Sequence, residues 1–307
     1  MRRVLNDLKI MLLANLWIVP VVAALVWALF QFVAPPPLMS ARMATGSVNG
    51  AYHQFALRLQ SELVQHGFEL HLHPTSGSRE NLALLLEDNP SIEIAMVQSG
   101  LERSLNSLEQ ARLESLGSVY QEPLWLFHRR DVTVERLGDL AGLRVGLGGE
   151  GSGTRAISDE LLTLNGFDPA QYPQNWQSLG GGKAASALQA GELDAAFFVG
   201  PAENATVKRL AQDSQVSLSN ISRVAAYRAR LPFLNQIEIS EGLLDLAANS
   251  PERNVLTLSP VATLVVNDEF NPGLVPLFLQ ASAEVMQDGT LLDAPGAFPS
   301  ADRKSVV

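Results

Sequence analysis

Residues 144–154 constrain the fold of this chain most strongly, because they read Arg-Val-Gly-Leu-Gly-Gly-Glu-Gly-Ser-Gly-Thr. The apolar run that ends at Leu147 predicts a buried strand, and the glycines after it allow a tight turn with positive φ. Ser152 then stands at the N-cap of a predicted helix over residues 154–164. A helix that begins after such a turn leaves backbone N–H groups free at its positive end. This stretch therefore predicts a site for an anion or another polar group.

Two further Gly/Ser turns repeat the pattern. Residues 44–50 read Ala-Thr-Gly-Ser-Val-Asn-Gly and residues 74–81 read Pro-Thr-Ser-Gly-Ser-Arg-Glu-Asn, and each stretch lies between an apolar run and an amphipathic one. Taken alone, each turn is more often an ordinary loop between a strand and a helix. Here there are three such turns, and no nucleophile or set of metal ligands stands beside them. This favours a cleft that binds a ligand through backbone and hydroxyl groups and does not change it chemically.

Two arginines closely follow these turns. Arg79 and Arg155 stand at the start of predicted helices, where the helix dipole disfavours a cation. Either they are ordinary surface residues, or an anionic ligand group lies between them. Gln98 ends a predicted strand and Tyr52 stands early in a predicted helix, positions at which open α/β sheets bind their ligands.

From Leu38 onward, strand-like and helix-like stretches alternate, which predicts an α/β fold with mostly parallel sheets. If the last strand returns to the first sheet, the chain crosses twice between lobe I (residues 43–130 and 250–300) and lobe II (131–249). Such a double crossover forms a hinge on which the lobes close around a ligand. The predicted strands are 39–44, 68–73, 92–97, 116–120, 124–129, 143–147, 175–179, 195–199, 217–218 and 256–266, and the predicted helices are 51–66, 79–87, 101–108, 154–164, 183–190, 203–212 and 272–287.

The N-terminal segment predicts a membrane anchor. No charged residue occurs between Ile10 and Ala41, and residues 10–34 are mostly apolar, about the length that spans a bilayer as a helix. Three basic residues precede this run, so the positive-inside rule keeps residues 1–9 in the cytoplasm. The body after the linker 35–42 then lies in the periplasm, tethered to a bacterial inner membrane by one pass. A cleaved signal peptide is the competing interpretation, which the length of the apolar run disfavours.

Composition and spacing weigh against several other classes of function. Cysteine is absent, which excludes disulfides and thiolate chemistry, and the net charge of −10 argues against a nucleic-acid partner. Gly146, Gly148 and Gly151 match a dinucleotide fingerprint, which also needs an acid further along to bind the ribose. Asp168 has the right spacing for that acid, but it lies in a loop before a proline. A Walker loop would need a lysine where Gly153 stands. We therefore expect no enzymatic activity, no cofactor and no metal.

Eight short motifs follow one another along the exported part. They are residues 44–47 with Tyr52, 75–81, 95–98, 122–125, 139–142 with 145–146, 151–154, 190–195 and 297–300. In this order they resemble the TAXI family of solute-binding proteins, which serve tripartite ATP-independent periplasmic (TRAP) transporters. The resemblance implies a two-lobed periplasmic-binding-protein fold that closes on a small, usually acidic solute, such as a dicarboxylate or an amino acid. The implied partner is a separate TRAP permease in the membrane. The alternative role is a membrane-tethered domain that senses a ligand for a signalling system.

Carried residue by residue onto this chain, the resemblance implies a ligand site built on the three turns. Gly77, Arg79 and Arg155 adjoin the same turns and complete the set of candidates. The residues implied by the resemblance are Thr45, Gly46, Ser47, Tyr52, Ser76, Ser78, Asn81, Gln98, Ser152, Gly153 and Thr154.

The chain departs from the family at both ends. Typical members have a cleaved signal peptide, whereas a tethered subset is expected to continue past the Phe-Pro-Ser segment into another membrane helix. This chain instead ends in residues 302–307, Asp-Arg-Lys-Ser-Val-Val. The common sequencing-adapter stretch GATCGGAAGAGCGTCGTG encodes the same six residues. We therefore expect residues 301–307 to be a non-native tail and the natural protein to be longer.

Overall fold

The computed structural model describes residues 14–32, 38–88 and 90–300, and the chain divides after Leu38 into a short and a large unit. The short unit contains the helix α2 (Ile18–Phe32). Among the described residues, no helix combines the length and the apolar character needed to cross a membrane. The predicted span of residues 10–34 extends past the described residues at both ends, and residues 1–9 and 301–307 lie outside them.

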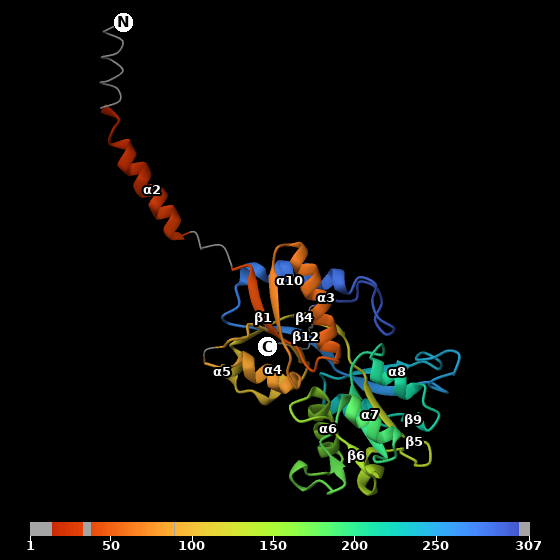
Figure 1. The fold of residues 1–307 in the computed structure, drawn as a ribbon. Coiled ribbons are helices and arrows are strands. Elements are labelled where there is room, and N and C mark those ends of the chain that lie inside the picture. Colours follow the sequence, from red (N-terminus) through yellow and green to blue (C-terminus); the bar gives the residue numbers. More distant parts are fainter. Residues whose placement is uncertain (1–13, 33–37, 89, 301–307) are drawn as a thin grey trace. The chain divides into compact units, whose positions relative to one another are not determined.

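In the large unit, two five-stranded sheets form two lobes (Figure 1). The sheet of lobe I has the order β2-β1-β3-β12-β4. The strand β1 is parallel to β2 and β3, whereas β12 is antiparallel to β3 and β4. Two helices, α3 and α10, pack side by side on one face, and α4 covers the other. The elements are β1 (Ser40–Ala44), α3 (Ala51–Gln65), β2 (Glu69–His73), α4 (Ser78–Leu85), β3 (Ile94–Gln98), β4 (Leu113–Gln121), β12 (Val261–Asn267) and α10 (Val275–Val285).

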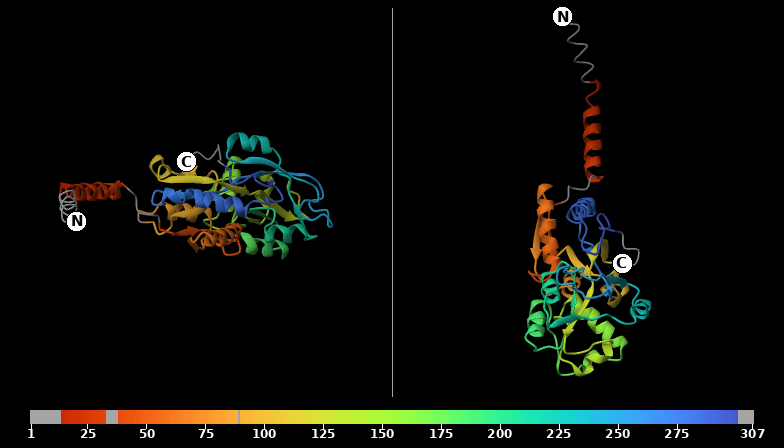
Figure 2. Two further views of the ribbon diagram at one scale, coloured as in Figure 1. Left: turned by 90° about the horizontal axis from the view of Figure 1, so that it is seen from above. Right: turned by 90° about the vertical axis from the view of Figure 1, so that its right-hand side faces the viewer.

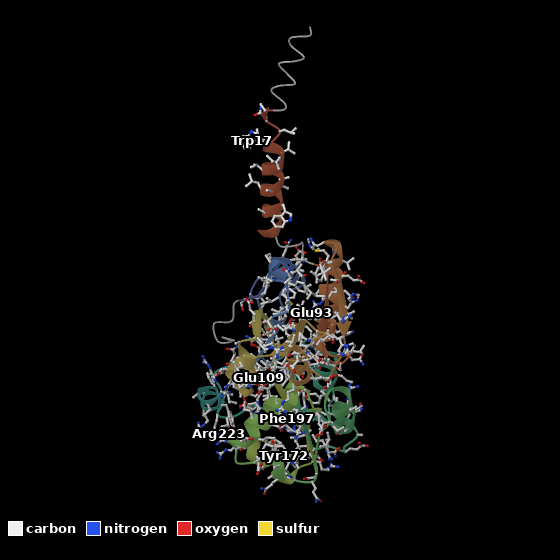
Figure 3. The ribbon with its side chains drawn as sticks, turned by 90° about the vertical axis from the view of Figure 1, so that its left-hand side faces the viewer. Trp17, Glu93, Glu109, Tyr172, Phe197 and Arg223 are labelled. Carbon is white, nitrogen blue, oxygen red and sulfur yellow. The ribbon has the colours of Figure 1, made fainter. Side chains whose placement is uncertain are left out.

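The sheet of lobe II has the order β7-β6-β8-β5-β9, with β5 antiparallel to β8 and β9. The helix α6 covers one face, where Phe197 of β8 is fully buried (Figure 3), and α7 and α8 cover the other. A separate antiparallel pair, β10 and β11, joins these cores. The elements are β5 (Leu124–Arg129), β6 (Val145–Gly146), α6 (Gly153–Leu164), β7 (Trp176–Gln177), α7 (Gly181–Gln189), β8 (Ala195–Val199), α8 (Ala205–Ala211), β9 (Val216–Leu218), α9 (Val224–Arg230), β10 (Asn235–Ile239) and β11 (Val255–Ser259).

The cores follow from the spacing of apolar residues. Phe55, Leu59 and Leu63 recur every four residues along α3, so they share one face of the helix. All three are buried in the same apolar cluster as Phe278 of α10. Each lobe has apolar clusters on both faces of its sheet, so each lobe is a three-layer body.

The chain crosses between the lobes at two neighbouring places. The first crossing runs through Glu122 between β4 and β5, and the second through Pro260 between β11 and β12. The Glu122 N–H donates to the Pro260 carbonyl oxygen at 3.0 Å, which ties the two crossings together. Figure 2 shows the C-terminal part, in blue, returning to the lobe built from the N-terminal half. The predicted double crossover is therefore present.

Most predicted strands and helices agree with the structure to within a few residues, and in each sheet four of the five strands run in the same direction, but the prediction did not include the one antiparallel strand in each. Both sheets are mixed, because β5 and β12 enter antiparallel after the crossings. The predicted strand 256–266 is two strands in different sheets. Pro260, which has no N–H for a strand ladder, separates them.

Two other predictions also need correction, and two elements were missed. The predicted helix 101–108 consists of a 3₁₀ turn, η1 (Leu101–Ser104), and a new helix, α5 (Ser107–Gln110), because Asn106 forms a capping box that starts a second helix.

Lobe I was expected to extend to residue 130, yet β5 belongs to the lobe II sheet, so the crossing precedes it. The helix α9 and the strand β10 were not predicted. The remaining short turns are η2 (Leu137–Gly142), η3 (Pro169–Gln171) and η4 (Pro272–Leu274).

Candidate ligand-binding site

The three Gly/Ser turns lie together between the lobes and enclose a cavity of about 130 Å³, here called the turn cavity. The turns connect β1 to α3, β2 to α4 and β6 to α6. Ten of the fourteen predicted candidates line the cavity, and their role in ligand binding stays a prediction. The lining residues are Gly46, Ser47, Gly50, Ala51, Tyr52, Ser76, Gly77, Ser78, Gln98, Glu122, Ser152, Gly153, Thr154 and Val199.

The turns of opposite lobes touch one another. Gly77 of lobe I has a φ of 128°, and a Cβ at this position would lie 3.3 Å from the Cα of Ser152 in lobe II. Glycine is needed here both for the backbone conformation and for the close approach. The Arg79 N–H donates to the Gly151 carbonyl oxygen at 3.1 Å, a second contact between the lobes. The lobes are therefore closed around the cavity.

Hydrogen-bond donors dominate the cavity wall. Three helices, α3, α4 and α6, begin there, and the first N–H groups of a helix have no partner within it. The positive ends of their dipoles favour a negative charge between them. The amide oxygen of Gln98 is also in the wall, buried and without a hydrogen-bond partner among the described residues. Several donors at the wall are already used within the protein, such as the Tyr52 hydroxyl, the Ser76 Oγ and the Ser152 Oγ, so helix N-termini are the main donors left for a ligand, with one free amide acceptor.

Glu122 is a cavity residue that the sequence analysis did not select. Its carboxylate oxygen Oε2 accepts a hydrogen bond from the Tyr52 hydroxyl at 2.8 Å, and that hydroxyl also lies 3.1 Å from the Ser78 Oγ. Burial raises the pKa of Glu122 to about 8, against the opposing effect of the Tyr52 hydrogen bond. Near neutral pH this carboxyl is mostly protonated, so it can donate a hydrogen bond to an anion. The available signal was a single acid within the otherwise uncharged residues 116–127.

Two candidates, Thr45 and Asn81, are structural in this conformation. The Asn81 Nδ2 donates to the carbonyl oxygens of Thr45 at 2.8 Å and Met96 at 2.7 Å, and its Oδ1 accepts from the Thr75 hydroxyl. The Thr45 hydroxyl lies 3.0 Å from the His53 Nδ1. Both side chains are fully buried and outside the cavity lining. They hold the first turn against β3, and so shape the site without facing it.

Arg79 and Arg155 also lie outside the cavity lining, and both pair with Asp159 of α6. The Arg79 Nη2 lies 3.7 Å from one Asp159 oxygen, and the Arg155 Nε donates to the other at 2.7 Å. The Arg155 guanidinium also lies 5.7 Å from the ring centroid of Tyr172, which is on lobe II (Figure 3). The anionic group between the two arginines is therefore a carboxylate of the protein itself rather than a ligand group.

Residues 43–288, which span both lobes, match the NMT1-like family. The chain belongs to the NMT1-like family. This assignment covers the sheets, the two crossings and all three turns of the cavity. The narrower TAXI assignment rests on the motifs and stays a proposal.

This NMT1-like protein is similar in structure to proteins of low sequence identity. A protein from Bordetella bronchiseptica RB50 has 15% identity and a TM-score of 0.55, with 81% of this chain and 71% of that chain covered. A periplasmic transporter has 10% identity and a TM-score of 0.52, with 85% and 90% covered. A protein of Listeria monocytogenes assigned as an L-cystine ABC transporter has 12% identity and a TM-score of 0.50, with 83% and 93% covered. These likenesses confirm the two-lobed periplasmic-binding-protein fold.

Proposed function

We propose that this NMT1-like protein is an extracytoplasmic receptor that captures a small anionic solute by closing its lobes around the turn cavity. The observation that carries the proposal is a single cavity walled by turns from both lobes, which meet at Gly77 and Ser152. Such a cavity exists only when the lobes are closed, so a solute that binds in it favours the closed form. Helix N-termini and hydroxyl groups in the wall supply the donors for an anionic group.

The size of the cavity narrows the class of solute. Its volume of about 130 Å³ is that of roughly four water molecules, well below the roughly 300 Å³ at which typical ligand pockets begin. A small dicarboxylate or an amino-acid-like solute is therefore the appropriate scale. Glu122 suits either class, because its protonated form donates to a carboxylate and its ionised form accepts from an ammonium group.

We further propose that residues 10–34 anchor the receptor in a bacterial inner membrane and that it delivers its solute to a TRAP-type permease. The support for the anchor is the charge-free run from Ile10 to Ala41 with basic residues before it. The support for the permease is the ordered set of TAXI-like motifs.

A thermal-shift screen of the full chain against dicarboxylates, amino acids and keto acids tests the proposal, because a bound solute raises the melting temperature by mass action. Calorimetry then measures the affinity of each hit for the wild type and for Thr154→Ala. The Thr154 side chain lines the cavity, so we expect its loss to weaken binding by about 1–3 kcal/mol.

The matched control is Thr163→Ala, a solvent-exposed threonine of the same helix, which should bind as the wild type does. Ser152→Ala is a less selective probe, because the Ser152 Oγ also accepts from the Arg155 N–H and caps α6. A screen without a single shift, or equal affinities of the wild type and Thr154→Ala, would contradict the proposal.

A further inference from the structure

A second and larger cavity adjoins the turn cavity and plays no part in the proposed function. Its volume is about 820 Å³, within the range of small-molecule sites. Ala51 lines both cavities, so they are neighbours along the same cleft. We call the second one the outer groove. Its lining residues are Asn49, Ala51, Gln54, Leu57, Arg58, Ser61, Tyr120, Pro201, Glu203, Asn204, Ala205, Met286, Gly289 and Thr290.

Both lobes wall the outer groove. Lobe I contributes α3, the end of β4 and the segment that follows α10, and lobe II contributes the residues that lead from β8 into α8. Figure 1 shows α3 and α8 on the same side of the molecule, one in each lobe. A molecule bound in the groove would touch both lobes.

The two charged side chains of the groove differ in whether they already have a partner. Arg58 is its one cation, and its exposed guanidinium makes no hydrogen bond or ion pair with any residue that the structure describes. Glu203 is its one acid within the described lining, and the Glu203 Oε1 already accepts from the Leu291 N–H at 2.5 Å. That donor is neutral, so Glu203 keeps its charge, and the groove holds one cation and one acid. Of the two, Arg58 is the one without a hydrogen-bond or ion-pair partner among the described residues.

Tyr120 supplies a second unused donor. Its side chain is only 3% exposed, and its hydroxyl has no hydrogen-bond partner among the described residues. The ring packs edge-on against Phe55 at 6.0 Å between centroids, which fixes its direction. Burial and the nearby Glu122 carboxyl raise the pKa of Tyr120, so the hydroxyl keeps its proton, and Arg58 lies near enough for its charge to oppose that shift. A buried donor without an acceptor is unfavourable, so an acceptor here would be stabilising.

Apolar side chains make up much of the remaining wall. Leu57 is 41% exposed on α3, and Pro201, Ala205 and Met286 line the groove with it. We propose that the outer groove is a second ligand site, which takes an organic acid with an apolar body. The acid group lies at Arg58 and the Tyr120 hydroxyl, and the body lies against Leu57, Pro201 and Met286.

This site does not depend on the turn cavity being a solute site. Because both lobes form the groove, an acid bound there stabilises the closed form. It therefore raises the affinity of any solute of the turn cavity, and by reciprocity that solute raises the affinity of the acid.

The proposal can be tested with 1-anilinonaphthalene-8-sulfonate, a fluorescent acid with an aromatic body, titrated into the purified full chain. We expect saturable binding that octanoate displaces and that octanol, which has the same apolar body without the acid, does not displace at equal concentration. Displacement by octanol as effective as that by octanoate overturns the proposal.

Variants locate the binding. Arg58→Gln should weaken binding of the probe by tenfold or more, Arg58→Lys should restore most of it, and Arg228→Gln, at an exposed arginine of α9, should leave it unchanged. Ala205→Trp places a large ring in the groove at an exposed position and should abolish binding. Thr154→Ala should bind the probe as the wild type does, which separates this site from the turn cavity. Equal affinities of Arg58→Gln and the wild type overturn the proposal, whatever Ala205→Trp does.

Discussion

The two lobes present turns of similar composition to the cavity but hold them in different ways. In lobe I, buried side chains brace the turns, with Asn81 bonded to the backbone of both Thr45 and Met96. In lobe II, backbone bonds to the β7 segment do more to hold the turn after β6: the Gly148 N–H donates to the Leu179 carbonyl oxygen at 2.9 Å, and a single buried hydroxyl, that of Ser158, donates to the Leu147 carbonyl oxygen at 2.6 Å. Within the turn, Gly148 has a φ of 100°, and the Ser152 Oγ donates to the Gly149 carbonyl oxygen at 2.6 Å.

This difference indicates which half of the site is preformed. A buried side-chain network in lobe I has no alternative partners in water, so it persists whether the lobes are open or closed. The lobe II turn is partly exposed apart from Gly148, and some of its contacts, such as that of Gly151 with Arg79, exist only on closure. Lobe I therefore holds the fixed half of the cavity, and lobe II brings the other half to it.

The largest effect should come from breaking the brace in lobe I. Asn81→Ala removes the side-chain donor to two buried carbonyl oxygens and the acceptor of the Thr75 hydroxyl, so we expect it to lower the free energy of unfolding by about 3–5 kcal/mol. Ser152→Ala, the corresponding change in lobe II, removes one helix cap and should cost about 1 kcal/mol. Urea denaturation of both variants measures the two costs. Equal losses would remove the distinction between the lobes.

A somewhat smaller effect, dependent on pH, should come from Glu122 at the crossing between the lobes. Its pKa is raised by burial from an ordinary value of 4.5 to about 8, so the folded protein binds one more proton than the unfolded chain between these pH values. This group therefore makes the wild type progressively less stable as pH rises from about 4.5 to 8, by a few kcal/mol in all.

Glu122→Gln removes this dependence and keeps an acceptor for the Tyr52 hydroxyl. We expect the free energy of unfolding of the variant, relative to that of the wild type, to rise as the pH increases across the same window. Below pH 4 the difference between the two proteins should stay constant. Denaturation at pH 4, 6 and 8 measures it. Burial also raises the pKa of Asp293, but this residue is present in both proteins, so its effect on stability cancels in the difference between them. A constant difference between pH 4 and 8 would show that Glu122 is ionised in the folded protein.

The parts of the fold that sequence predicted are those fixed by local chemistry. The spacing of Phe55, Leu59 and Leu63 determines α3, and the glycines after Leu147 determine the third turn. The mixed sheets could not be predicted in this way, because the direction of β12 depends on a crossing at Pro260 that returns it to a distant sheet. Pro260 is a local signal for a break in the strand, but no local pattern shows that the residues on its two sides belong to different sheets.

The candidate site shows the same division. The turns were predicted, since their glycines and hydroxyls are visible in sequence. The roles of Arg79 and Asn81 were not, because each depends on a partner that is distant in sequence. The role of Arg155 was missed although its partner Asp159 stands one helical turn later. Glu122 was missed for a related reason: an acid at a crossing becomes a cavity residue only when both lobes bury it.

The smallest effect should come from the pair between Arg79 and Asp159, which joins the two halves. The Arg79 side chain is 46% exposed and 3.7 Å from the carboxylate, so the pair contributes less than about 1 kcal/mol and salt screens it. Arg79→Gln, which leaves the Asp159 bonds with Arg155 and Tyr172 in place, should therefore weaken binding of a turn-cavity solute by no more than about fivefold, and the difference from the wild type should shrink in 1 M salt. Calorimetry at two salt concentrations measures this, with Arg228→Gln, at an exposed arginine of lobe II, as the control. A loss of tenfold or more would mean that charge, rather than the contact of the glycine turns, holds the lobes together. In that case the half of the cavity in lobe II would depend on a side chain for closure, and the contrast with lobe I would fail.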